Sequence, residues 1–209
     1  MSDSKSARLA PLPIPEWDDE IMDALGAFPG GLKFVMTQFQ SESGDMRGSH
    51  VLGIFANYPA LAKAFLTFNN HVAANSSLTF RERELLILRT GWLRKCEYEF
   101  VQHIVLGKRS GLTEEEIAGI QQGPDAAILQ AEDALLVRAA DELHKNTDLS
   151  DATYLALSEK YNHRQIMDII GCVGCYTIIA FMANSLRVPM EEGAVPLDDT
   201  TRAEMLNQQ

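Results

Sequence analysis

The chain has 209 residues, which suits one large domain or two small ones and is ample for a hydrophobic core. Its net charge of −11 argues against binding to nucleic acid, because proteins that bind the phosphate backbone carry an excess of Lys and Arg. With 46% hydrophobic and 22% charged residues, the composition is that of an ordinary globular protein.

Hydropathy and cysteine content indicate the cellular setting. The chain lacks a run of about 18 apolar residues, so we expect no membrane-spanning segment. The N-terminal stretch MSDSKSARLAPLPIPEW lacks the apolar core of a secretory signal. A count of 3 cysteines is too low for a disulfide scaffold. These observations predict a reducing, cytoplasmic location.

The first part of the chain, residues 1–49, is predicted to be an N-terminal arm with one short helix. Its first 16 residues are polar and then spaced by prolines, which favours extended backbone. A short helix is expected over residues 18–25, ended by the Pro29-Gly30-Gly31 sequence. A polar loop near residues 41–49 then leads into the main body.

Residues 50–190 are predicted to form one all-α domain, followed by a C-terminal tail over residues 191–209. Apolar residues keep helical spacing throughout, and nowhere do four or more residues alternate convincingly with period two. Helix starts are marked by Pro59, by capping boxes at Thr79-Phe80-Arg81-Glu82 and Thr113-Glu114-Glu115-Glu116, and by Ser150. Longer helices are expected over residues 96–108, 126–145 and 163–186, the first ended by Gly111 and the last followed by Pro189.

The candidate catalytic residues are Glu84, Cys96, Glu99 and His103. Cys96, Glu99 and His103 are spaced i, i+3 and i+7, so they share one face of a helix. Glu84 lies on the preceding predicted helix. Burying an acid, a thiol and an imidazole together costs free energy, so such a cluster indicates a functional role. Clusters of this kind are also where proteins shift pKa values. His103 is the natural proton shuttle, because its free pKa lies near neutrality.

Each of these residues also has an ordinary structural interpretation. His103 could be a core histidine hydrogen-bonded to a backbone carbonyl, and Glu84 a surface ion-pair partner of a nearby arginine. Glu99 could be a solvated carboxylate on a helix face, and Cys96 a small buried apolar thiol. The direction of the Cys96 pKa shift is left open, because a helix N-terminus lowers a thiol pKa whereas neighbouring carboxylates raise it.

Three further residues are candidates for substrate binding: His71, Trp92 and Tyr98. The two aromatic residues flank the catalytic set, although aromatics at helical spacing are also typical of a core. Cys172 and Cys175 form a Cys-x-x-Cys pair, which elsewhere indicates redox chemistry or metal binding. Here they lie in a glycine-bearing apolar helix with no second ligand pair nearby, so packing is favoured and no metal site is predicted.

Three segments resemble the superfamily of carboxymuconolactone decarboxylase and alkyl hydroperoxidase D: RERELLILR at 81–89, CEYEFVQH at 96–103 and GLTEEEI at 111–117. The resemblance extends over roughly residues 50–190. It implies a single-domain helical bundle of the alkyl hydroperoxidase D-like type, here with an extended N-terminal arm. It also implies a homo-oligomer, a trimer or hexamer, acting on a small molecule, and, for the decarboxylase branch, no metal or organic cofactor.

The match to the motif is incomplete. In the hydroperoxidase branch, a glutamate is followed twelve residues later by Cys-x-x-Cys and then by a histidine four residues further on. These positions fall at Glu84, Cys96, Glu99 and His103, so Glu99 replaces the second cysteine. A glutamate cannot resolve a sulfenic acid, and the dithiol relay of that branch is therefore missing from this motif.

The resemblance thus favours the decarboxylase branch, a cofactor-independent lyase that works through an enol or enolate. In such a scheme His103 transfers the proton, Glu84 orients it, and Glu99 serves as a second acid or base. Two alternatives stay open: a thiol-dependent peroxidase using Cys96 with an external thiol, and a non-catalytic helical oligomer.

Electrostatics limits the substrate. If Glu84 and Glu99 were both charged, each close pair of like charges would cost about 4 kcal/mol at an effective dielectric near 20. We therefore expect a small, mostly apolar carbonyl compound and not carboxymuconolactone itself.

Overall fold

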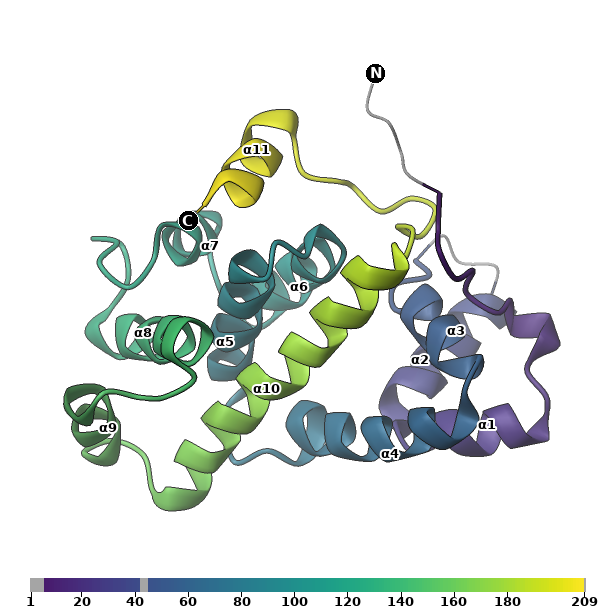
Figure 1. The fold of residues 1–209 in the computed structure, drawn as a ribbon, viewed down its shortest axis with the longest axis horizontal. Coiled ribbons are helices and arrows are strands. Elements are labelled where there is room, and N and C mark those ends of the chain that lie inside the picture. The colour runs from purple at the N-terminus through teal and green to yellow at the C-terminus, as the bar shows by residue number, and fades with distance from the viewer. Residues whose placement is uncertain (1–5, 42–44, 209) are drawn as a thin grey trace. The chain divides into compact units, whose positions relative to one another are not determined.

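The computed structural model describes residues 6–41 and 45–208. Within these ranges the regular elements are helices, and no β-strand occurs, which confirms the all-α class (Figure 1). The chain divides into two compact units. The first comprises residues 1–75 and 181–196, and the second comprises residues 76–180 and 197–209. This division differs from the predicted arm, domain and tail, whose boundaries stay a prediction.

The first unit contains most of the predicted N-terminal arm. Residues 6–13 are not helical, and the Leu12 N–H donates to the Gly53 carbonyl at 2.9 Å. A Cβ at position 53 would lie 2.8 Å from the Leu12 carbonyl oxygen, so this close approach requires glycine. Its helices are η1 Ile14–Glu16, α1 Asp19–Leu25, α2 Pro29–Gln40, α3 Ser49–Ala56, α4 Pro59–Asn70 and the π-helix η2 His71–Asn75.

The prediction around Pro29 is wrong. The Pro29-Gly30-Gly31 sequence was expected to end a helix, whereas Pro29 begins α2. Proline suits the first helical position, because its missing N–H has no partner in the helix there and its φ angle is already helical. The two following glycines weaken the helix signal without preventing the helix.

The second unit contains the predicted motif helices. They are α5 Phe80–Leu93, α6 Glu97–Arg109, α7 Glu114–Gln122, α8 Ala131–Asn146 and α9 Asp151–Ser158, together with most of α10 His163–Leu186 and with α11 Asp199–Asn207. Two details differ from expectation. Helix α8 begins at Ala131, not near Ala126, because a turn in which the Leu129 N–H bonds the Ala126 carbonyl precedes it. The expected tail contains α11, which Asp198 caps through the N–H groups of Thr200 and Thr201.

Helix α5 is the central element of the second unit and packs against α6, α7 and α8. Every residue from Glu84 to Trp92 is buried, so this helix is enclosed on all sides for more than two turns. Both predicted capping boxes are present, with Thr79 accepting from the Glu82 N–H and Thr113 from the Glu116 N–H. The enclosure of α5 explains how acidic and basic residues in its middle become buried.

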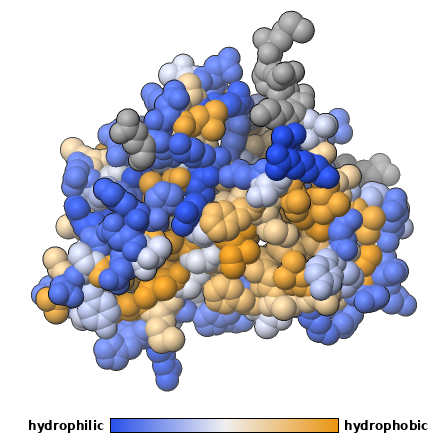
Figure 2. Space-filling view, viewed as in Figure 1, coloured by the Kyte–Doolittle hydropathy of each residue, from blue (hydrophilic) through white to orange (hydrophobic). Residues whose placement is uncertain are grey.

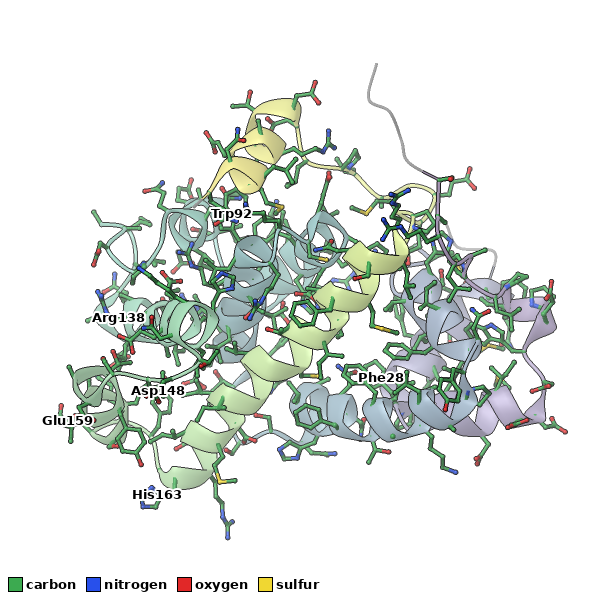
Figure 3. The ribbon with its side chains drawn as sticks, in the orientation of Figure 1. Phe28, Trp92, Arg138, Asp148, Glu159 and His163 are labelled. Atoms are coloured by element: carbon green, nitrogen blue, oxygen red, sulfur yellow. The ribbon has the colours of Figure 1, made fainter. Side chains whose placement is uncertain are left out.

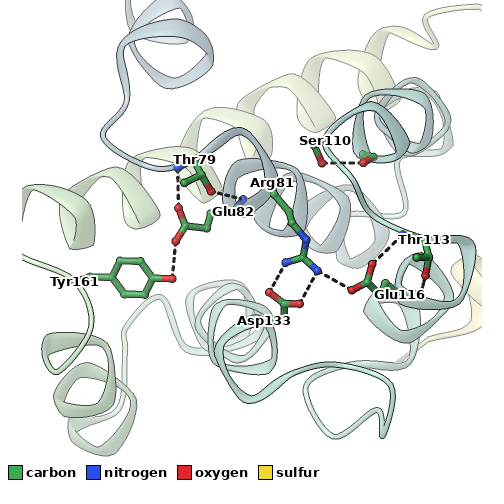
Figure 4. A network of polar contacts seen from close by, with 9 residues as sticks. Thr79, Arg81, Glu82, Ser110, Thr113, Glu116, Asp133 and Tyr161 are labelled. Carbon is green, nitrogen blue, oxygen red and sulfur yellow. Dashed lines mark hydrogen bonds and ion pairs between the residues drawn. The ribbon is translucent and has the colours of Figure 1, made fainter.

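Polar contacts tie the start of α5 to its neighbours (Figure 4). The Arg81 guanidinium donates to both carboxylate oxygens of Asp133 on α8, at 2.6 and 2.8 Å, and to Glu116 on α7 at 2.7 Å. The Tyr161 hydroxyl donates to Glu82 at 2.9 Å. These contacts join the first turn of α5 to α7, to α8 and to Tyr161.

Helix α10 is long and apolar. It is long enough and apolar enough to cross a membrane by length and composition, with a mean hydropathy of 2.0, contrary to the expectation from the sequence. One such helix is weak evidence, because a core helix passes the same test. Met167, Ile170 and Ile178 on α10 are exposed, and Figure 2 shows hydrophobic side chains on the face from which α10 is seen in Figure 1. Other α10 side chains are buried in the second unit, as described below.

The buried Arg89 predicts a large contribution to stability. Its guanidinium donates to Asp141 on α8 at 2.5 and 2.9 Å and to the carbonyls of Ile120 and Gln121 at 2.8 Å. Arg89→Ala would leave an acid and two carbonyls without their partner, and should lower the free energy of unfolding by about 3 kcal/mol or more. Urea denaturation followed by circular dichroism measures the loss. An equal loss in the exposed control Arg109→Ala would contradict this assignment.

Candidate active site

Helices α5 and α6 bring Glu84 and His103 into direct contact. The Nδ1 atom of His103 lies 2.8 Å from Oε2 of Glu84. The Glu84 side chain is 4% exposed and that of His103 is 12% exposed, so His103 is the member of the pair that meets solvent. A carboxylate can only accept a hydrogen bond, which assigns the ring proton to Nδ1 and leaves Nε2 free to exchange a proton.

Glu99 is buried beside this pair as an acid without a hydrogen-bond partner. It is 2% exposed, and neither of its carboxyl oxygens has a partner among the described residues. Burial, and then the charge of Glu84, raise its pKa well above the ordinary value of 4.5. Burial therefore favours the neutral form of Glu99 to a higher pH than in an ordinary glutamate, and in that form the carboxyl group can donate a hydrogen bond, unlike a solvated carboxylate.

Gly91 explains how this carboxyl group fits between α5 and α6. A Cβ at position 91 would lie 3.1 Å from Oε1 of Glu99 and 3.5 Å from the backbone nitrogen of Phe100. The absent side chain lets α6 approach α5 closely and leaves room for the acid. The repulsion expected from the sequence required Glu84 and Glu99 both to be charged. The raised pKa of Glu99 favours its neutral form, which reduces the expected repulsion between the two side chains and between Glu99 and an anionic substrate.

Cys96 is the N-cap residue of α6 and is fully buried. Burial, and then the carboxyl group of Glu99, raise the pKa of the thiol, and the bond from the Glu99 N–H offsets only part of this effect. The question left open by the sequence is thus answered, because desolvation outweighs the helix terminus. All three cysteines are buried, and none of them forms a disulfide. Cys96 in this state is a poor nucleophile.

The proposed substrate-binding residues are divided between the two units. Trp92, labelled in Figure 3, is 4% exposed and packs against Phe100 with ring centroids 5.3 Å apart. Tyr98 is 7% exposed. Both lie in the apolar surroundings of α5 and α6. His71 belongs to η2 in the first unit, so its contribution to this site stays a prediction.

Tyr176 on α10 was not singled out from the sequence. Its ring stands edge-on to the imidazole of His103, with centroids 5.0 Å apart and an interplanar angle of 89°. Cys172 lies one turn earlier on the same face of α10, and burial, then Cys175 and then Glu84 raise its pKa. The sequence shows that Cys172 and Tyr176 share one face of a helix, but it does not show that this face packs against His103 of α6. Within the described residues no group of three or more His, Cys, Asp or Glu is placed to hold a metal ion.

Comparison with known proteins agrees with this architecture. Residues 59–141 match the model of the carboxymuconolactone decarboxylase family. Among curated proteins, none matches the sequence.

Solved structures are similar to this chain over a larger part of its length than the family model. A peroxidase-related protein from Ralstonia eutropha JMP134 with an alkylhydroperoxidase AhpD core is 18% identical, with a TM-score of 0.67 over 90% of this chain and 98% of that one. A peroxidase-related protein from Silicibacter sp. TM1040 is 19% identical, with a TM-score of 0.65 over 93% and 97%. The debrominase Bmp8 is 12% identical, with a TM-score of 0.63 over 94% and 96%. At these identities the likeness shows the fold and leaves the reaction open.

The raised pKa of Glu99 predicts a pH-dependent loss of stability. Above pH 4.5 the unfolded chain releases a proton that the folded protein keeps, so the stability of the wild type falls as pH rises toward the folded pKa. Glu99→Gln should remove this term and become increasingly stabilised relative to wild type, by up to about 1.4 kcal/mol per pH unit. Chemical denaturation from pH 4 to pH 8 measures the difference. A constant difference, or one matched by the exposed control Glu115→Gln, would refute it.

The burial of the thiols predicts slow alkylation. At pH 8 the native protein should react with iodoacetamide at Cys96 at least about a hundredfold more slowly than the urea-unfolded chain, because the thiolate is disfavoured and shielded. Peptide mass spectrometry over a time course assigns each modified cysteine. Rapid labelling of native Cys96 would contradict the burial described here.

Proposed function

We propose that the chain is a member of the superfamily of carboxymuconolactone decarboxylase and alkyl hydroperoxidase D, and that it is a cofactor-independent lyase of the decarboxylase type. Its reaction would pass through an enol or enolate of a small, mostly apolar carbonyl compound. The observation that supports this most directly is the 2.8 Å contact between His103 and Glu84. Beside it, Glu99 is an acid whose raised pKa favours the neutral form.

His103, Glu84 and Glu99 each have a separate role in the proposed mechanism. In a decarboxylation, the C–C bond to the carboxylate breaks, CO₂ leaves, and the electron pair moves to the carbonyl oxygen. His103 first binds a proton from solvent at Nε2, and the enolate carbon then takes this proton. Glu84 accepts the hydrogen bond from Nδ1–H and stabilises the imidazolium form. Glu99 donates a hydrogen bond to the enolate oxygen, a role that requires a carboxylic acid kept neutral by its apolar surroundings.

The same set of groups supports proton transfer without decarboxylation. His103 would remove a proton from the carbon next to the carbonyl and return it, at the same or a neighbouring carbon. The partial exposure of the His103 side chain, 12% against 4% for Glu84, supports an approach of substrate from the His103 side. We include Trp92, Tyr98 and His71 as proposed substrate contacts. Homo-oligomeric assembly, as a trimer or hexamer, and a cytoplasmic location are further proposals.

A thiol-dependent peroxidase using Cys96 is the second candidate, because two of the similar structures are peroxidase-related proteins. Burial of Cys96 and its raised pKa work against it, since the thiolate is the form that attacks peroxide. Glu99 also stands where a resolving cysteine would be needed. A non-catalytic helical oligomer is the third candidate and predicts no activity of either kind.

The test follows deuterium incorporation from D₂O next to the carbonyl of small apolar ketones, together with CO₂ release from the matching β-keto acids. His103→Ala should lower either rate by at least about a hundredfold, because the proton carrier is lost. Glu84→Gln should lower it by about tenfold or more, because the imidazolium loses its countercharge. Cys96→Ser should keep most of the activity. Nuclear magnetic resonance and mass spectrometry measure both reactions.

Controls separate the candidates. His163→Ala removes an exposed histidine at the start of α10 and should leave the rates unchanged. Peroxide reduction with an added dithiol is assayed in parallel on each variant. Peroxide turnover abolished by Cys96→Ser, with no effect of His103→Ala on carbonyl chemistry, would replace the lyase by the peroxidase. Absence of both activities across the panel would favour the non-catalytic protein.

A further inference from the structure

Helix α10 places a second buried side chain against the imidazole of His103. The Tyr176 ring meets it edge-on, with centroids 5.0 Å apart and an angle of 89°. His103 is thus held from two helices at once: Glu84 of α5 contacts its Nδ1 atom, and Tyr176 of α10 contacts its ring. The perpendicular arrangement is one that aromatic rings prefer, because the positive edge of one ring faces the negative face of the other.

The hydrogen bond to Glu84 alone leaves the ring orientation loosely defined. Rotation of an imidazole about its Cβ–Cγ bond has broad energy wells, and a hydrogen bond tolerates a wide range of angles. Nε2 lies on the opposite side of the Cβ–Cγ axis from Nδ1, so a rotation of the ring changes the direction in which Nε2 presents its proton or lone pair. Proton transfer to carbon is sensitive to such changes.

Tyr176 is itself buried, and its side chain adds no charge beside His103. It is 6% exposed, and on the same face of α10 lie Cys172, 1% exposed, and Ala180, which is fully buried. Burial, and then the charge of Glu84, raise the pKa of its hydroxyl well above the ordinary value. The phenol therefore stays neutral near neutral pH and acts on His103 through its ring.

We propose that Tyr176 is a positioning residue, whose ring holds the imidazole of His103 in the orientation in which Nε2 exchanges a proton with substrate. This inference rests on the proposed function, in which His103 carries the proton. The hydroxyl of Tyr176 has no part in it, and neither does the chemistry of Cys172 and Cys175. A hydrophobic side chain without a ring could fill the space but could not supply the edge-to-face contact.

Two substitutions separate the ring from the hydroxyl. Tyr176→Phe keeps the ring and should leave the rate of deuterium incorporation within about twofold of wild type. Tyr176→Leu removes the ring and should lower that rate by at least about tenfold. Long-range ¹⁵N–¹H spectra of the imidazole, recorded without substrate, should show mainly the Nδ1–H tautomer of His103 in wild type and Tyr176→Phe. In Tyr176→Leu the two nitrogens should become averaged or broadened.

Tyr161→Leu provides the matched control. Tyr161 is another buried tyrosine of the second unit, and its hydroxyl contacts Glu82 at the start of α5. Its loss should lower thermal stability while leaving the His103 spectrum unchanged. A folded Tyr176→Leu variant with unchanged His103 signals would overturn the proposal. So would a Tyr176→Phe variant as impaired as Tyr176→Leu, because the hydroxyl would then be responsible. The spectra test positioning even if no carbonyl compound is turned over, which would count against the proposed function alone.

Discussion

The burial of acidic groups inside α5 and α6 is the constraint on which the rest of the second unit depends. A buried carboxylate must be hydrogen-bonded, paired with a cation or protonated. Glu84 is hydrogen-bonded to His103, and burial raises the pKa of Glu99, which favours its protonated form. The buried cation of the same helix, Arg89, does not neutralise either of them, because its guanidinium bonds Asp141 and two backbone carbonyls.

The geometry of α5 accounts for this separation. Glu84 and Arg89 are five residues apart, which places them about 140° apart around the helix axis. Glu84 therefore meets α6, and Arg89 meets α8 and the end of α7. An enclosed helix can serve two opposite requirements in this way. One side carries the Glu84–His103 pair, and the other carries the Arg89–Asp141 ion pair.

Glu99 illustrates how function and stability oppose each other in the proposed mechanism. Its carboxyl group has no hydrogen-bond partner among the described residues, and its burial destabilises the fold wherever the unfolded chain would ionise it. A side chain of this kind is explained most simply by a group that it must meet during the reaction. Gly91 provides the space, burial and then the charge of Glu84 raise the pKa of the acid, and Cys96 is buried beside it. The thiol is in this view part of the wall of the site and not its nucleophile.

The sequence by itself determined the helical class, most helix boundaries and the four residues of the motif, because capping boxes, apolar spacing and the i, i+3, i+7 pattern are local signals. The predictions were wrong where local signals were ambiguous: Pro29 begins a helix, and α8 starts at Ala131. The direction of the Cys96 pKa shift, the raised pKa of Glu99 and the contact between Tyr176 and His103 were decided only by the tertiary structure. Each depends on desolvation or on the packing of helices far apart in the chain, and neither is encoded in the spacing of residues along one helix.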